Sequence, residues 1–140
     1  MKNQINLGTH IIIRNEANEI LLCKRNKKFG FGEWELPGGH IGFQKSFEQN
    51  LERECKEELG INVKVGKLVS VATNMKYGNH YVIFTFLSES FIGKPERKEQ
   101  HEHSKVNWFN LNKLPENLFI STKYAIEDYL SGNVHNSKRS

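Results

Sequence analysis

Residues 39–61 read GHIGFQKSFEQNLERECKEELGI and carry the strongest local signals in the chain. Ser46 is a preferred N-cap residue, and Gln49 follows three positions later, as a reciprocal capping box requires. Every fourth residue of the segment 47–59 is apolar, which gives one stripe for a hydrophobic core. Gly60 stands where a helix prefers a residue in the left-handed conformation. The stretch therefore predicts a helix over residues 47–59.

Three glutamates lie on one face of this predicted helix. Glu54, Glu57 and Glu58 are spaced i, i+3 and i+4, so their side chains share a face. Carboxylates this close repel one another, and oxygen ligands suit hard divalent cations such as Mg²⁺ or Mn²⁺. An ion of this kind can bind phosphate oxygens, stabilise developing negative charge and activate water. The alternative is a solvated acidic face that pairs with Arg53 or Lys56.

The residues upstream of the helix favour the metal site. Residues 37–40 read Pro-Gly-Gly-His, and glycines there allow the backbone to approach phosphate or metal closely. Arg53 lies 14 positions after Gly39, and residues 53–61 read Arg-Glu-Cys-Lys-Glu-Glu-Leu-Gly-Ile. In this spacing the run resembles the Nudix box, the signature of the Nudix hydrolase family. Together with residues 78–82, Gly-Asn-His-Tyr-Val, it is similar to the MutT-type nucleoside triphosphate diphosphatase branch.

The resemblance implies a metal site and its ligands. Glu54, Glu57 and Glu58 would bind Mg²⁺ or Mn²⁺, with the backbone carbonyl of Gly38 as a further ligand. Arg53 would orient the glutamates by ion pairing. Either Glu54 or Glu57 would act as general base for the attacking water, and the sequence leaves that choice open.

Three residues are candidates for binding the substrate. His40 has a counterpart in similar proteins that lines the substrate pocket, and a turn histidine facing solvent is the alternative. Phe31, flanked by two glycines, is hard to explain as a core residue and is the candidate for stacking on a base. Lys45 is a candidate contact for a substrate phosphate as a point charge. Glu102 lies where such proteins often hold an extra carboxylate, although a surface role fits it better.

The first half of the motif departs from the family pattern. The family has glutamate where this chain has Lys45, an acid where it has Gly42, and glycine where it has Gln44. Two acids are missing and a cation has entered, so we expect fewer bound metals or slower turnover. Glu48 is a candidate replacement carboxylate, with an exposed helix residue as the alternative.

The remaining chain consists of short β-type runs and one further helical run. Strands are predicted at residues 9–14, 19–25, 34–36, 61–65, 67–72, 80–87 and 105–109, and a helix at 122–130. The first two strands are expected to form a hairpin across residues 15–18, and residues 26–33 and 88–104 are expected to be loops. The order predicts mixed α and β layers, and the resemblance implies an α+β fold, a Nudix-type α/β/α sandwich with a central mixed sheet. One domain is expected over residues 1–130, followed by a flexible tail over 131–140.

Composition restricts the class of protein. The chain has 140 residues, of which 37% are hydrophobic and 26% charged, with a net charge of +4. This favours one domain of globular type. The chain lacks an apolar run of membrane-spanning length and a signal-like N-terminus, so a cytoplasmic location and no membrane partner are expected. Lysines and arginines are spread along the chain, which argues against nucleic acid. Cys23 and Cys55 are expected to be reduced thiols, and a homodimer is left open.

We therefore expect a metal-dependent hydrolase that cleaves the diphosphate linkage of a nucleoside triphosphate or a related nucleoside diphosphate derivative. Two alternatives stay open. One is a nucleotide-sugar or ADP-ribose hydrolase on the same fold. The other is a catalytically weak nucleotide-binding module, suggested by Lys45, Gln44 and Gly42.

Overall fold

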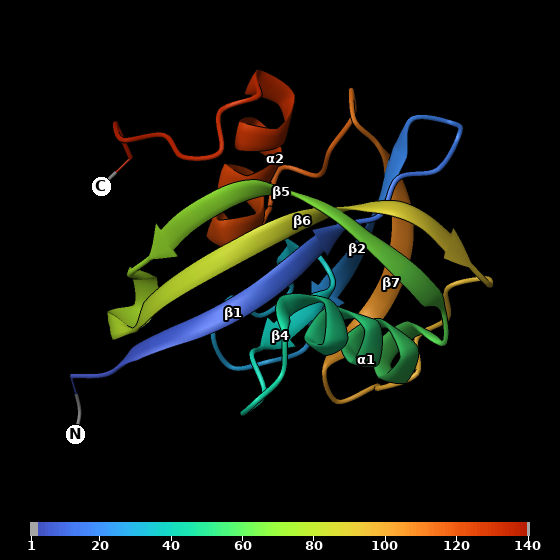
Figure 1. The fold of residues 1–140 in the computed structure, drawn as a ribbon, viewed down its shortest axis with the longest axis horizontal. Coiled ribbons are helices and arrows are strands. Elements are labelled where there is room, and N and C mark those ends of the chain that lie inside the picture. Colours follow the sequence, from blue (N-terminus) through green and yellow to red (C-terminus); the bar gives the residue numbers. More distant parts are fainter. Residues whose placement is uncertain (1–2, 140) are drawn as a thin grey trace.

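The computed structural model describes residues 3–139, in which two α-helices enclose two packed β-sheets (Figure 1). In chain order the elements are β1 (Ile5–Ile12), β2 (Glu19–Arg25), β3 (Trp34–Glu35), β4 (Gly38–His40), α1 (Phe47–Leu59), β5 (Asn62–Asn74), a 3₁₀ turn η1 (Lys76–Gly78), β6 (His80–Ile92), β7 (His103–Asn110) and α2 (Ile120–Ser131). Helices α1 and α2 lie on opposite sides of the strands (Figure 1).

The strands are divided between a mixed sheet and an antiparallel sheet. The mixed sheet has the order β4-β1-β6-β5, with β1 parallel to β6 and antiparallel to β4. The second sheet has the order β3-β2-β7. The predicted α+β class and α/β/α sandwich are confirmed. In place of the single central sheet that was predicted, the structure has two sheets.

Strand β1 contributes to the hydrophobic cores on both sides of the mixed sheet. Successive side chains of a strand point to opposite faces. Ile11 is fully buried with Leu51 of α1, whereas Ile12 is fully buried with Ile126 of α2. A strand covered on both faces needs a continuous apolar run, which explains the three isoleucines at residues 11–13.

Helix α1 has the predicted boundaries because its end signals are local. The Ser46 side chain accepts from the Gln49 backbone N–H at 3.1 Å, and the Ser46 backbone N–H donates to Gln49 Oε1 at 3.0 Å. Gly60 ends the helix at φ +72°. The capping box and the left-handed C-cap are therefore both present.

The predicted hairpin near the N-terminus is wrong. Strands β1 and β2 do not form one continuous hairpin, because they belong to different sheets and the Arg14–Ile20 bridge joins only their ends. Residues 38–40, for which no strand was predicted, pair as β4 with residues 8–10 of β1. A Cβ atom on Gly38 would lie 2.0 Å from the Thr9 carbonyl oxygen, so this pairing depends on glycine.

The second half of the chain has longer elements than the sequence predicts. Strand β6 continues through residues 88–92 because they pair with β5, with Val63 opposite Phe91. The predicted loop at 88–104 is therefore reduced to residues 93–102. Strands β5 and β7 and helix α2 are also longer than predicted.

The residues after α2 turn back onto the protein. The Val71 N–H donates to the Val134 carbonyl at 2.8 Å, and His135 Nδ1 lies 3.0 Å from the Val71 carbonyl oxygen. Arg139 donates to both carboxylate oxygens of the buried Asp128, at 2.8 and 2.7 Å. The flexibility of this tail stays a prediction, but up to Arg139 it makes specific contacts with β5 and α2.

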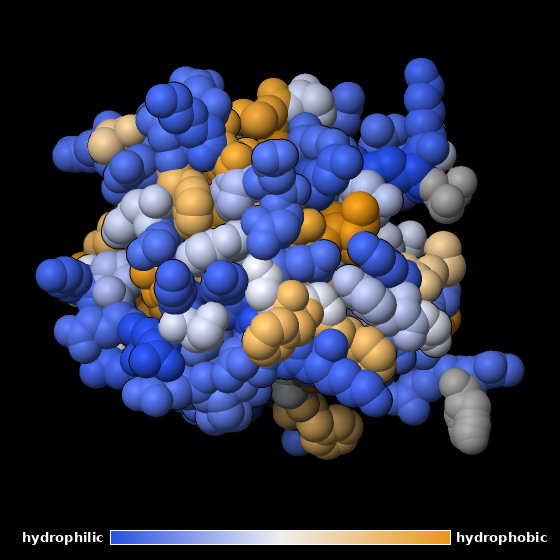
Figure 2. All heavy atoms as spheres, turned by 180° about the vertical axis from the view of Figure 1, so that it is seen from behind, coloured by the Kyte–Doolittle hydropathy of each residue, from blue (hydrophilic) through white to orange (hydrophobic). Residues whose placement is uncertain are grey.

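Apolar and polar residues are interspersed on the surface seen in Figure 2, where hydrophilic residues predominate. Among residues 3–139, no helix combines the length and apolar character needed to cross a membrane.

Candidate active site

Two carboxylates of α1 converge in a buried position. The Glu58 side chain is 4% exposed, and its Oε1 has no hydrogen-bond partner within residues 3–139. Burial, followed by the neighbouring Glu54 carboxylate, raises the pKa of Glu58 well above its usual range. A cation bound between these two side chains would remove the repulsion and satisfy the unpaired oxygen.

The glycine backbone of β4 lies directly against this pair. A Cβ atom on Gly39 would lie 3.0 Å from Glu54 Oε1, so a side chain there would displace the carboxylate. Gly38 precedes it at φ +147°, a conformation that other residues rarely adopt. Gly39 therefore brings its backbone to the Glu54 carboxylate, and the close approach of this backbone to phosphate or metal stays a prediction.

Arg53, which directly precedes Glu54 in the helix, forms ion pairs with two of the three glutamates. It donates to Glu54 Oε2 at 3.0 Å and to Glu57 Oε1 at 3.1 Å. A further bond of 3.0 Å joins Arg53 to Asn50 Oδ1. Asn50 is fully buried and also donates to the His40 carbonyl at 3.0 Å, so it fixes the β4–α1 loop to the helix.

The predicted set of three glutamates does not meet at one point. The Glu57 side chain is 51% exposed and faces Arg53, while Glu54 and Glu58 face each other. Within the described part of the chain, no group of three His, Cys, Asp or Glu side chains is arranged to hold a metal ion. The structure thus assembles two of the three expected carboxylates next to Gly39, and Arg53 holds the third beside them.

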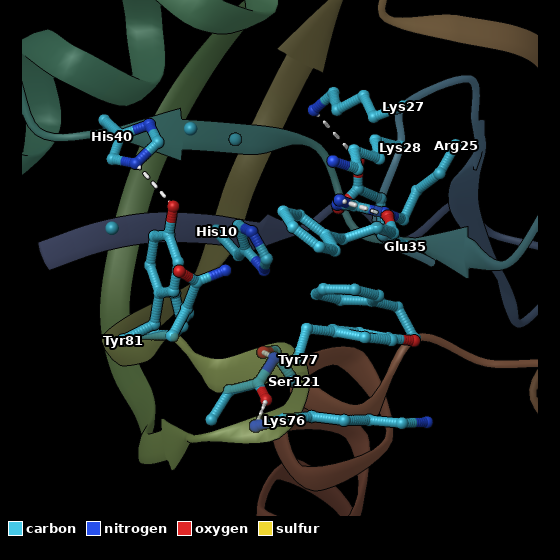
Figure 3. Close-up of a pocket in the computed structure, with 18 residues that line it drawn as sticks. His10, Arg25, Lys27, Lys28, Glu35, His40, Lys76, Tyr77, Tyr81 and Ser121 are labelled. Carbon is cyan, nitrogen blue, oxygen red and sulfur yellow. Dashed lines mark hydrogen bonds and ion pairs between the residues drawn. The ribbon is translucent and has the colours of Figure 1, made fainter. Parts of the chain in front are cut away.

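A cavity of about 340 Å³ opens next to Gly38 and Gly39 (Figure 3). Its volume is in the range of small-molecule sites. Its lining combines basic and aromatic side chains with one buried carboxylate. These are Arg25, Lys27, Lys28 and Lys76, then Phe29, Tyr77, Tyr81 and Phe119, and finally Glu35.

The buried carboxylate belongs to an ionic network. Glu35 Oε1 accepts from Arg25 at 2.6 Å, and Oε2 lies 3.0 Å from His103 Nε2 and 3.6 Å from Lys27 Nζ. Burial alone would raise the pKa of Glu35, but His103, Lys27 and Arg25 together hold it well below its usual range. Lys27 also pairs with Glu102 at 3.0 Å. Glu35 is therefore a fixed anion beside the cavity.

Arg25 attaches the loop of residues 26–33 to the cavity wall. Its guanidinium donates twice to the Phe29 carbonyl, at 3.0 and 2.8 Å, and lies 4.0 Å from the centre of the Phe119 ring. The Phe29 and Tyr77 rings are 5.6 Å apart with a tilt of 30°. These contacts hold aromatic faces beside the cavity, where a flat heterocycle can stack.

Comparison with known proteins identifies the family. The NUDIX domain matches residues 5–129. The chain belongs to the Nudix family. It is 32% identical to the 8-oxo-dGTP diphosphatase of Escherichia coli over 79% of this chain and 84% of that protein. It is also 32% identical to the ADP-ribose pyrophosphatase of Methanocaldococcus jannaschii, over 84% of this chain and 69% of that protein.

Solved structures agree with this assignment. The MutT NUDIX hydrolase from Burkholderia pseudomallei is 33% identical, with a TM-score of 0.84 over 90% of this chain and 98% of that chain. Some other relatives are longer, and the chain spans 29% and 32% of two of them. The protein is a Nudix hydrolase, an enzyme that hydrolyses pyrophosphate bonds. Nudix hydrolases generally use divalent metal ions.

Of the predicted substrate residues of this Nudix hydrolase, only His40 lines the cavity. His40 Nε2 lies 2.9 Å from the Tyr81 hydroxyl (Figure 3). Phe31 is 72% exposed and away from the cavity, whereas Phe29 lines it. Lys45 is exposed on the loop before α1 and does not line the cavity either.

Sequence reasoning missed the Arg25–Glu35 pair. A signal was present at Glu35 alone, which lies between Trp34 and Leu36, where a charge needs a partner, whereas Arg25 follows Lys24 at the end of its strand. The two neighbouring histidines His101 and His103 have different surroundings in the structure. His103 is buried against Glu35, while His101 is exposed.

Proposed function

We propose that this Nudix hydrolase uses Mg²⁺ or Mn²⁺ to cleave the diphosphate linkage of a nucleoside triphosphate or a related nucleoside diphosphate derivative. The observation that carries the proposal is the convergence of Glu58 on Glu54, whose carboxylate lies against the Gly39 backbone beside a cavity lined by basic and aromatic side chains. In support of it, one relative of this chain is an 8-oxo-dGTP diphosphatase.

The residues fit a hard divalent cation. The donors are oxygens only, the buried Glu58 Oε1 atom has no hydrogen-bond partner within residues 3–139, and the missing Cβ of Gly39 lets the Glu54 carboxylate lie close to the backbone. We assign Glu54, Glu57, Glu58 and the Gly38 carbonyl as ligands. For Glu57 this requires its side chain to turn from Arg53. A bound divalent ion supplies charge stabilisation for phosphate oxygens and lowers the pKa of attacking water.

The protein's own residues position the reaction. Arg53 holds Glu54 by an ion pair and pairs with Glu57 until that side chain turns to the metal, and one of these two glutamates takes the proton of the attacking water. Asn50 fixes the loop that follows β4. These interactions set the geometry before the substrate arrives, which is the main contribution expected in phosphoryl chemistry.

The cavity holds the nucleoside in this proposal. Phe29, Tyr77 and Phe119 offer aromatic faces for the base. Lys28 and Lys76 line the same cavity and form no ion pair within residues 3–139, so their charges are available to an anionic substrate. Lys45, exposed outside the cavity, is no longer favoured as a phosphate contact.

A second candidate substrate is ADP-ribose or a nucleotide sugar. The observation that favours it is the 32% identity to an ADP-ribose pyrophosphatase over 84% of the chain. Both candidates need the same acidic helix and differ in the group beyond the scissile bond.

The test is a panel of nucleoside triphosphates, nucleoside diphosphates, ADP-ribose and nucleotide sugars, assayed with Mg²⁺, with Mn²⁺ and with EDTA. We expect hydrolysis that requires metal and is reduced roughly 100-fold in Glu57→Gln. Glu52→Gln, an exposed carboxylate of the same helix, is the matched control and is expected to retain activity. Binding of nucleotides without any hydrolysis would support the weak binding module instead.

A further inference from the structure

His10 is a polar residue at a strand position that otherwise calls for an aliphatic side chain. It precedes three isoleucines in β1 and is 7% exposed. Strand alternation puts it on the same face as Ile12, which packs towards α2. On that face the His10 ring projects into the cavity, between Tyr81 and Glu35 (Figure 3). A histidine here is not explained by packing alone.

The His10 ring lacks the hydrogen bonds that a buried polar group normally has. Its Nδ1 is buried and has no partner within residues 3–139. A polar atom left unpaired in the interior costs free energy, and such exceptions in a native protein call for an explanation.

The polar groups next to His10 in the cavity already form hydrogen bonds or ion pairs with other residues. Both oxygens of Glu35 are bound by the ionic network described above. Asn74 donates to the Ser121 hydroxyl at 3.0 Å and accepts from the Lys76 N–H at 3.0 Å. The hydrogen-bonding capacity of His10 is therefore left for a ligand.

The chemistry of the ring indicates which part of a ligand it contacts. The His10 ring is buried in a cavity lined by the cations Arg25, Lys27 and Lys28, and both features favour the neutral imidazole. A neutral imidazole has one N–H donor and one acceptor nitrogen. That pair matches the polar edge of a nucleobase better than a phosphate, for which the cavity offers lysines. The aromatic rings that line the same cavity supply the stacking surface for such a base.

We propose that His10 hydrogen-bonds to the edge of the substrate's base and makes this enzyme select among nucleobases. The proposal rests on the proposed function, since it assumes that the cavity holds a nucleoside. His10 is a specificity-determining residue and takes no part in the bond cleavage at Glu54 and Glu58.

The test is His10→Val, because valine suits a buried strand but cannot form hydrogen bonds. Values of kcat and KM are measured for triphosphates of the four common bases and of 8-oxoguanine, and for inorganic tripolyphosphate, which has no base. We expect KM for the preferred base to rise roughly tenfold, with kcat and tripolyphosphate hydrolysis unchanged. His10→Asn, which keeps a donor and an acceptor, is expected to retain part of the preference.

Thr85→Val is the matched control. Thr85 lies opposite His10 in the β1–β6 ladder, and its Oγ1 is also buried without a partner. If His10 only stabilises the fold through its contact with Thr85, His10→Val and Thr85→Val will both change the thermal midpoint. Neither will then change the preference for one base over another. Unchanged base preference in His10→Val, or an equal loss for all substrates, would overturn the proposal. A wild-type enzyme that cleaves no nucleotide would overturn it together with the proposed function.

Discussion

Replacement of Glu58 by glutamine tests the electrostatics of the acidic helix without a substrate. Burial and the Glu54 carboxylate raise the pKa of Glu58 from an ordinary 4.5 to about 10. Below pH 4.5 the group is protonated in both the folded and the unfolded chain. As the pH rises through the interval up to about 10, the unfolded chain ionises Glu58 and the folded chain does not, so stability falls.

The size of the effect follows from this interval. Each pH unit corresponds to about 1.4 kcal/mol, so the roughly 2.5 units up to pH 7 cost the metal-free protein about 3 kcal/mol. Glu58→Gln removes this penalty because glutamine does not ionise. In EDTA at pH 7 the variant is therefore expected to unfold roughly 10 °C higher than the wild type, with no difference at pH 4.5.

Thermal unfolding of both proteins between pH 4.5 and 8, in EDTA and in Mn²⁺, measures the effect. Mn²⁺ should stabilise the wild type increasingly as the pH rises, because metal binding releases the Glu58 proton. It should stabilise Glu58→Gln much less. Equal stability of the two proteins in EDTA at pH 7, or equal stabilisation by Mn²⁺, would refute the reasoning.

Three further predictions concern the tail, the cavity and the altered motif. Arg139→Met should lower the free energy of unfolding in urea by about 3 kcal/mol, because it leaves the Asp128 charge buried and unpaired; a loss below about 1 kcal/mol would mean that the tail does not hold Asp128. Phe29→Ala should raise KM for the nucleotide roughly fivefold to tenfold, while Phe31→Ala should leave KM within about twofold; the reverse ranking would mean that the loop has another arrangement in solution. Lys45→Glu should lower the Mn²⁺ concentration that gives half-maximal activity by roughly tenfold if the missing loop acid limits metal binding, and an unchanged concentration would show that it does not.

Elements with local signals could be predicted from the sequence. Helix α1 was placed correctly because Ser46, Gln49 and Gly60 determine its ends through contacts within one turn. The pairing of β1 was not predictable in this way. Its partner β6 lies about 70 residues away, and a tight connection at residues 15–18 looks the same whether the flanking strands share a sheet or not.

The candidate site was predicted where residues are adjacent in sequence and missed where distant elements meet. The contacts of Arg53 with Glu54 and Glu57 follow from helical spacing. The ionic network of Glu35 does not, because its partners come from β2, the following loop and β7. The choice between Phe31 and Phe29 depends on how the loop turns, which the composition of the loop leaves undetermined.

The most direct measurement is anomalous diffraction from crystals of the wild-type enzyme soaked in Mn²⁺. If Glu54 and Glu58 bind the divalent ion, a manganese peak is expected about 2.2 Å from their carboxylate oxygens, with the Gly38 carbonyl in the same coordination shell. A manganese peak elsewhere on the protein, with Glu54 and Glu58 still facing each other and no ion between them, would contradict it.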